Sequence, residues 1–279
     1  TNESVIRGEL VLDEGDPFAK LNLDKSIANI KSRNIFKKVD YEVVNGSSQN
    51  QKIINIDVEE RPTGEIAAGA GIGTDGGSFA FTVTENNWLG TGNALGFEVE
   101  VDSESLSGVL NYSKPNYNFL GNSMNYYIMS ESNDKPDQGY ENSIIAGGIS
   151  TSFEQYKNLD INLGLNASYD DLRTDNTASS ALKKQDGSFE ELAGTYGFTY
   201  DKRDRSFMPT RGAIYSFTQN LPIYADKSSI SNTYASSHFK SFNDNVVGAG
   251  KIYISTINSL DSDDVRLSKR KNLSSKRLR

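Results

Sequence analysis

The sequence predicts a mainly β fold, in which an antiparallel transmembrane barrel follows a small α+β domain. Residues 95–102 (LGFEVEVD) alternate strictly between apolar side chains and acidic residues or glycine. Successive side chains of a strand point to opposite faces, so this segment has one face for lipid and one for water. The same alternation recurs over 79–83, 161–169 and 192–200. No apolar run approaches 18 residues, so any membrane crossing is by strands rather than helices.

Strand length favours a membrane barrel over a soluble β-sandwich. The predicted strand 192–201 has ten residues, which extend over roughly 33 Å and, at a tilt of about 40°, span the apolar band of about 25 Å in outer-membrane barrels. Sandwich strands are usually about five or six residues long. A soluble β domain remains an alternative, and it predicts solubility without detergent.

The acids of residues 95–102 are expected to face the lumen. Turning the strand over would place Glu98, Glu100 and Asp102 in lipid at roughly 1 to 2 kcal/mol each. That sum rivals the net stability of a domain.

Composition excludes several classes of function. The net charge of −8 and a pI of about 4.9 argue against a nucleic-acid binder, whose phosphate contacts need excess Lys and Arg. The chain has no cysteine and one histidine, His238, which excludes a disulfide framework, thiol chemistry and a His-rich zinc site. It opens on Thr1 with neither an initiating Met nor a signal peptide, so we expect a piece of a longer protein.

Residues 1–62 predict an α-α-β-β unit. A first helix capped at Thr1 or Asn2 is followed by a second, capped at Asn22 and ending near Asn34. Two alternating strands follow, joined through a polar loop that begins at Asn45-Gly46. A two-stranded sheet is marginal alone, so we expect a third strand just before Thr1. The apolar faces are Ile6 and Leu10; Leu23, Ile27 and Ile30; Val39, Tyr41 and Val43; and Ile54, Ile56 and Val58.

Pro62 marks a domain boundary, because proline cannot continue a strand ladder and the composition then shifts to glycine and aromatics. The barrel is predicted over 63–279, with about 11 strands joined as successive hairpins. Short linkers at 87–93 and 157–158 contrast with long polar ones at 170–188 and after 257, as in barrels whose short turns face the periplasm. The predicted strands are 65–73, 78–85, 94–102, 105–113, 123–131, 143–154, 159–171, 189–201, 212–221, 230–241 and 245–256.

Three segments between or after the strands could carry function. Trp88, the only tryptophan, lies in a glycine turn (NNWLGTG, 86–92) and is interpreted as an interfacial anchor. Residues 201–212 (DKRDRSFMPTRG) interleave acids with Lys and Arg, which favours a salt-bridged turn over a Ca²⁺ site. The basic tail 266–279 is either a solvated loop or a loop folded over an acidic lumen. The glycine-rich 69–73 lies within a strand, so it is not a dinucleotide site.

Together these motifs resemble the BamA family of outer-membrane assembly factors over the whole chain. The matching segments are EERPTG (59–64) leading into a glycine-rich strand, NWLGTG (87–92), KPNY (114–117), and 201–212, of which Asp201, Asp204, Pro209, Thr210 and Gly212 carry the family-type turn. Residues 1–62 resemble the family's barrel-proximal POTRA domain without its first strand.

The resemblance implies a 16-stranded barrel in the outer membrane of a Gram-negative bacterium, with the POTRA domain in the periplasm. It also implies a lid loop that carries Val-Arg-Gly-Phe or a close variant. Arg277, Leu278 and Arg279 match the first half of that motif, so we expect the chain to be cut inside the lid loop, with about five closing strands missing.

The resemblance implies a protein that is not an enzyme and uses neither cofactor nor metal. It inserts nascent outer-membrane proteins into the bilayer by pairing their strands at an unstable seam, and periplasmic chaperones are possible partners. The glycine-rich 64–73 is the expected seam strand, and backbone groups of Ile66, Ala68, Ala70 and Ile72 are the predicted pairing sites. Glu9, on the first helix, resembles the family's contact with a BamD-like lipoprotein.

Two other membrane functions remain open. A two-partner-secretion transporter, which exports a polypeptide through its lumen, is distinguished by about two upstream POTRA units against about five. A passive porin lacks the α-α-β-β unit.

Overall fold

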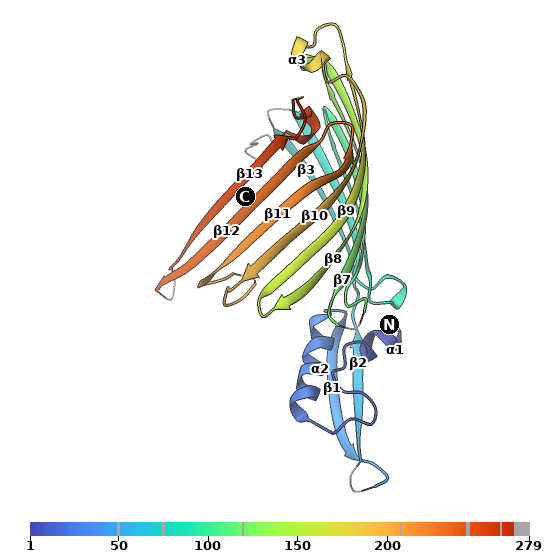
Figure 1. The fold of residues 1–279 in the computed structure, drawn as a ribbon. Coiled ribbons are helices and arrows are strands. Elements are labelled where there is room, and N and C mark those ends of the chain that lie inside the picture. The colour runs from blue at the N-terminus through green and yellow to red at the C-terminus, as the bar shows by residue number, and fades with distance from the viewer. Residues whose placement is uncertain are drawn as a thin grey trace.

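The computed structural model describes residues 1–48, 51–73, 76–118, 120–206, 208–243, 246–262 and 264–270. A small α/β unit comes first, and its second strand leads into a strongly curved antiparallel sheet (Figure 1). None of the described helices has the length and apolar character needed to cross a membrane.

The N-terminal unit consists of α1 (Glu3–Arg7), α2 (Lys20–Ser32), β1 (Phe36–Asn45) and β2 (Lys52–Glu60). The two strands pair antiparallel, with Tyr41 opposite Ile56, so the predicted apolar residues of the two strands lie opposite one another. The stripe predicted on the second helix is confirmed as buried, and it meets the start of β1 in one hydrophobic core. This core comprises Leu23, Ile27, Ile30, Ile35, Phe36 and Val39.

Two helix boundaries differ from the sequence prediction. Helix α2 begins at Lys20 after the extended residue Ala19, so Asn22 is not its cap but lies in the first turn, where its carbonyl accepts a hydrogen bond from Ser26. Helix α1 ends at Arg7, and Gly8 follows as its C-cap. Glycine is a poor helix former, and the helix does not continue beyond it. Glu9 therefore lies after the first helix rather than on it.

The large sheet has eleven strands in the described residues, and each pairs with its neighbours in the sequence, in the order β13 to β3. The predicted number and hairpin order of strands are confirmed. The strands are β3 (Gly64–Gly73), β4 (Gly76–Glu85), β5 (Ala94–Asp102), β6 (Ser105–Lys114), β7 (Ser123–Lys135), β8 (Tyr140–Tyr156), β9 (Leu159–Thr174), β10 (Gly187–Asp201), β11 (Gly212–Ala225), β12 (Ser229–Asn243) and β13 (Val246–Ser259).

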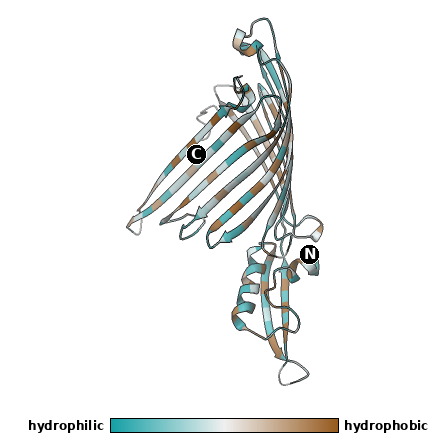
Figure 2. Ribbon diagram, viewed as in Figure 1, coloured by the Kyte–Doolittle hydropathy of each residue, from teal (hydrophilic) through white to brown (hydrophobic). Residues whose placement is uncertain are grey.

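The predicted alternation continues from strand to strand, because residues directly opposite one another share a face. Phe97 lies opposite Val83 and Leu110, and Glu98 lies opposite Thr82 and Val109. We call the face that carries Phe97 the apolar face and the face that carries Glu98 the polar face. Apolar and polar residues alternate along the strands (Figure 2).

Candidate functional site

The sheet ends at two strands, β3 and β13, that each have one neighbour among the described strands. The β3 segment (GEIAAGAGIG) contributes few large side chains, and those it has are exposed: Ile66 is 75% and Ile72 is 96% accessible. A strand that packs so little side-chain surface is held mainly by its backbone ladder with β4.

The ladder determines which backbone groups of β3 face the open edge. The amide of Asn86 donates to the carbonyl of Thr63 at 3.2 Å, so these opposite residues form a hydrogen-bonded pair. Such pairs alternate in an antiparallel ladder, and the β3–β4 register has no shift. The amides and carbonyls of Glu65, Ala67, Gly69 and Gly71 therefore face β4. Those of the alternate residues face the open edge, and these are Ile66, Ala68, Ala70 and Ile72.

The Trp88 turn joins the sheet to the N-terminal unit. It is a single 3₁₀ turn (Trp88–Gly90), and Gly90 accepts a hydrogen bond from the amide of Asn2 at 2.7 Å. Gly92 has a φ of +68°, and a Cβ there would lie 2.7 Å from Val5. Glycine is thus required at position 92 both for the turn and for the approach of α1. Trp88 itself is 41% exposed, and its role as an interfacial anchor stays a prediction.

Glu9 lies inside this junction. Its carboxylate is 3.6 Å from the guanidinium of Arg33, and both side chains are 12% exposed. Asn116, in the turn after β6, donates to Glu9 at 3.3 Å and to the carbonyl of Gly8 at 2.9 Å. Arg33 also donates to the carbonyl of Gly92. Burial lowers the pKa of Arg33, and the charge of Glu9 partly offsets this effect. The predicted contact of Glu9 with a lipoprotein stays a prediction.

The turn between β10 and β11 is closed by its own charges. Arg203 and Asp201 form an ion pair at 2.6 Å. The side chain and amide of Thr210, with the amide of Arg211, donate to Asp204 and lower the pKa of that carboxyl to about 2. Gly212 has a φ of +98°, and a Cβ there would collide with the carbonyl of Lys202. Four of the five family-type residues thus have a direct structural role in this turn: Asp201, Asp204, Thr210 and Gly212. The fifth, Pro209, lies in the same turn.

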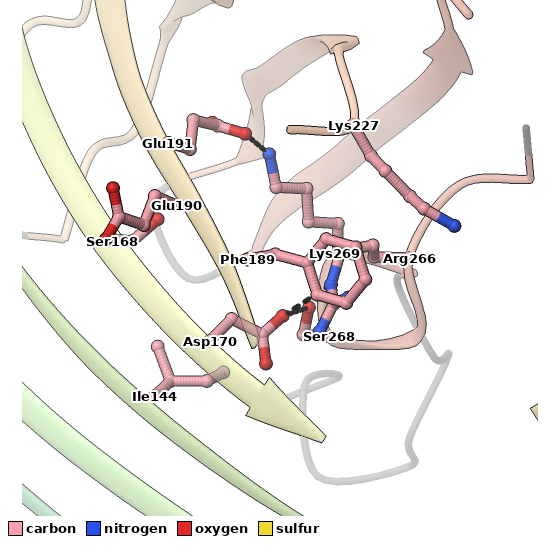
Figure 3. Close-up of a pocket in the computed structure, with 10 residues that line it drawn as sticks. All are labelled: Ile144, Ser168, Asp170, Phe189, Glu190, Glu191, Lys227, Arg266, Ser268 and Lys269. Atoms are coloured by element: carbon pink, nitrogen blue, oxygen red, sulfur yellow. Dashed lines mark hydrogen bonds and ion pairs between the residues drawn. The ribbon is translucent and has the colours of Figure 1, made fainter. Parts of the chain in front are cut away.

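The loop after β13 is attached to the polar face by Arg266, which is buried although it is charged. Its guanidinium lies 2.9 Å from the carboxylate of Asp170 on β9, with side-chain exposures of 5% and 10%. The guanidinium carbon is 3.4 Å from the ring centroid of Phe189 on β10, a cation–π arrangement. Figure 3 shows the Phe189 ring over Arg266, with dashed lines that join Asp170 to Arg266 and Ser268.

Three further contacts attach the same loop. Ser268 donates to Asp170, Lys269 pairs with Glu191, and the amide of Leu267 donates to Gln185 at 2.7 Å. Burial lowers the pKa of Lys269. A small cavity of about 160 Å³ adjoins these residues. Of the basic tail residues that the structure describes, Arg266 and Lys269 are thus folded onto acids of the sheet, whereas Arg270 is exposed and donates to the carbonyl of Val265.

For the alternative in which the basic tail folds over an acidic lumen, the sequence drew attention to the inward Glu98 and Glu100, and it did not single out Asp170 or Glu191. The signal for both was present: Tyr169 and Leu192 belong to the apolar alternation, so the residues next to them face the other way. The alternation does not show which polar-face acid a loop reaches. Lid residues Arg277, Leu278 and Arg279 lie outside the described residues, so their position stays a prediction. Among the described residues, no three His, Asp or Glu side chains are grouped to hold a metal ion.

Comparisons with known proteins agree with this architecture. BamA of Neorickettsia risticii, an outer membrane protein assembly factor, is 27% identical over 216 residues, which cover 76% of this chain and 29% of the relative. BamA of Neisseria meningitidis is 25% identical over 246 residues, which cover 81% and 31%.

Two solved structures share the fold. The crystal structure of Haemophilus ducreyi BamA lacking POTRA domains 1–3 matches with a TM-score of 0.75 at 22% identity, over 93% of this chain and 53% of that one. CdiB from Acinetobacter baumannii matches with a TM-score of 0.56 at 11% identity, over 93% and 51%. The chain thus spans about three tenths of the length of the curated relatives and half of the solved chains.

The family assignment rests on a match to the model of the Omp85 superfamily domain, which covers residues 87–274, more than half of the chain. The chain therefore belongs to the Omp85 superfamily, is homologous to BamA across the barrel region, and is a non-enzymatic protein of the bacterial outer membrane.

Proposed function

We propose that this chain is part of an outer-membrane protein assembly factor that inserts client barrels by pairing their strands with the open edge of β3. The observation that carries the proposal is which backbone groups of β3 face the open edge rather than β4. Four successive edge-facing residues, from Ile66 to Ile72, offer unpaired amides and carbonyls at one side of the sheet. An incoming strand that bonds to them satisfies its own backbone, which is β-augmentation.

The small side chains of β3 fit this role. Ala68 and Ala70 lie between Ile66 and Ile72 on the apolar face, and a Cβ at Gly69 would meet nothing within 4 Å. A client strand would therefore find backbone groups that large neighbouring side chains do not obstruct. Closure of the barrel by strands after residue 279, into the 16-stranded form, belongs to the same proposal.

The remaining partners follow from the same resemblance. We assign residues 1–62 to a periplasmic POTRA domain, Glu9 to a lipoprotein contact and the basic segment 277–279 to a lid over the lumen. The structure of the junction limits how a lipoprotein could contact Glu9. Because Glu9 is paired with Arg33 and with Asn116 of the turn after β6, a lipoprotein would have to approach it beside that turn.

A proline pair tests strand pairing. Ala68→Pro removes an amide that faces the open edge, whereas Ala67→Pro removes one that bonds to β4 opposite Thr82. We expect Ala68→Pro to leave the barrel folded and to slow client insertion at least about fivefold, the effect of one lost hydrogen bond of about 1 kcal/mol. Ala67→Pro should weaken the barrel itself.

The measurement is the rate at which a client barrel becomes heat-modifiable in vesicles that contain the full-length protein. Heat-modifiable migration of each variant reports its own folding. If Ala68→Pro folds and inserts the client at the unaltered rate, β3 is not the pairing edge. Export of a polypeptide into the vesicle without insertion would instead favour the two-partner-secretion alternative.

A further inference from the structure

A second site lies on the apolar face at the β13 end of the sheet, away from the open edge of β3 and from the loop after β13. It is an open groove of about 740 Å³ across the ends of β10, β11, β12 and β13. These ends lie on the same side of the sheet as Gly64, where the chain enters from the N-terminal unit. The groove is lined by aromatic and basic side chains over a glycine floor: Tyr200, Lys202, Tyr215, His238, Lys240 and Phe242.

The register places these side chains on the apolar face, which is the face predicted to meet lipid. Tyr200 lies opposite Leu159 on β9 and opposite Tyr215 on β11, and it shares the apolar face with Phe198 and Phe217. His238 lies opposite Ala213 and Gly250, and Lys240 lies opposite Gly248. The groove is thus at the edge of the apolar band, where a membrane changes from acyl chains to headgroups.

The groove is basic in a chain whose net charge is −8. Lys202 and Lys240 are exposed, and each ammonium lies over a ring, 5.2 Å from the centroid of Tyr200 and 5.9 Å from that of Phe242. No acidic residue is among the described residues that line it. The nearest acids along the chain, Asp201 and Asp204, are already paired within their turn. The lysines therefore have no anionic partner in the groove.

The glycines determine the shape of the groove. A Cβ at Gly248 would lie 2.5 Å from the ring of Phe242, so this ring rests on bare backbone. A Cβ at Gly250 would meet nothing within 4 Å, which leaves the floor open beside His238. On the adjoining strand, Tyr215 packs edge-on against His238 at 5.2 Å. The result is a recess with aromatic walls and two long cationic side chains at its mouth.

We propose that this groove binds an anionic glycerophospholipid of the leaflet on the side of the N-terminal unit. Lys202 and Lys240 would contact the phosphate, and the glycerol and first acyl carbons would lie over Gly250 between the aromatic rings. Lysines at this depth reach the headgroups while their stems stay in the apolar band. The proposal rests on the outer-membrane location of the chain and is independent of strand pairing at β3.

The test measures lipid affinity of the full-length protein in micelles, by native mass spectrometry during titration with phosphatidylglycerol. Lys202→Gln with Lys240→Gln should weaken binding about thirtyfold, or about fivefold for each lysine near a membrane surface. Gly250→Leu should weaken binding while keeping both charges, because it fills the floor. Lys251→Gln is the matched control, since Lys251 lies opposite Ser237 on the polar face of the same strand.

Each outcome decides the proposal. Loss of affinity in the double lysine variant and in Gly250→Leu, with Lys251→Gln unchanged, supports a shaped lipid site. Equal losses for Lys251→Gln would show nonspecific charge attraction and overturn it, as would unaltered binding by the double variant. Full competition by soluble sn-glycerol 3-phosphate would identify a free phosphate ester rather than a membrane lipid as the ligand. Heat-modifiable migration verifies that each variant folds.

Discussion

Replacing Asp170 with alanine should release the loop after β13 from the sheet. Arg266 would then be a buried cation without its carboxylate, and breaking a buried ion pair costs about 3–5 kcal/mol. The side-chain exposures of 5% and 10% justify this range instead of the smaller value for surface pairs. Ser268 would lose its acceptor at the same time.

Hydrogen exchange at the amide of Leu267, which donates to Gln185, measures this release. If the whole cost appears as local opening, exchange should accelerate about 150-fold at 3 kcal/mol and more at 5 kcal/mol. Asp171→Ala is the control on the same strand, because its partner Arg173 is 70% exposed. The control should change exchange by about fivefold at most. A change this small for Asp170→Ala would refute the assignment of Arg266 as a buried anchor.

Substitutions at Arg266 separate charge from stacking. Arg266→Lys keeps the charge but loses the planar group over Phe189, an interaction of about 0.5–2 kcal/mol. Its effect should therefore be smaller than that of Arg266→Ala. The double variant Asp170→Ala with Arg266→Ala leaves neither charge buried alone, so its cost should be less than the sum of the two single costs.

Three further predictions concern the turns and the junction. Gly212→Ala should destabilise the protein by about 1–3 kcal/mol in urea unfolding, because position 212 has a positive φ and the added Cβ collides with the carbonyl of Lys202. Gly69→Ala, where the added Cβ meets open space, should be nearly neutral. Folding lowers the pKa of Asp204 to about 2, so the hydrogen bonds to its carboxylate should be fully present above the ordinary carboxyl pKa and be lost as the pH falls through about 2. Hydrogen exchange of the Thr210 amide measures this loss, and Asp204→Asn should remove the pH dependence. Arg33→Ala should broaden spin-label distances between α2 and residues 114–122, whereas the exposed Lys31→Ala should not.

The strands were predictable because lipid and water impose a period of two on the sequence. Residues 94–102 were predicted with the observed bounds. Strand β8 extends from 140 to 156 rather than from 143 to 154, because its backbone ladder with β7 and β9 continues into polar residues where the apolar period has ended. The first helix was predicted too long. Ile6 and Leu10 have the i, i+4 spacing of a helix, but Leu10 packs on the core from beyond the end of α1.

The sequence contains only part of what defines the open edge of β3. It predicted β3 as the seam strand from its glycines, and it proposed Ile66, Ala68, Ala70 and Ile72 as the pairing residues. It offered no means of choosing between this set and the alternate residues of the same strand. One hydrogen bond between Asn86 and Thr63 decides between the two sets, because an antiparallel ladder alternates from any paired residue.

The sequence by itself predicted which face of the strand at residues 95–102 meets lipid, because burying Glu98, Glu100 and Asp102 in a bilayer is too costly for the opposite orientation. It also determined the order of hairpins and the turns that require glycine. Only the tertiary structure decided which charges meet: Arg266 and Asp170 are 96 residues apart and belong to elements joined by no local pattern. Tertiary structure likewise brought Glu9 to Arg33 and Asn116. Periodicity specifies a face, whereas a pair between distant elements depends on strand tilt, loop path and register together.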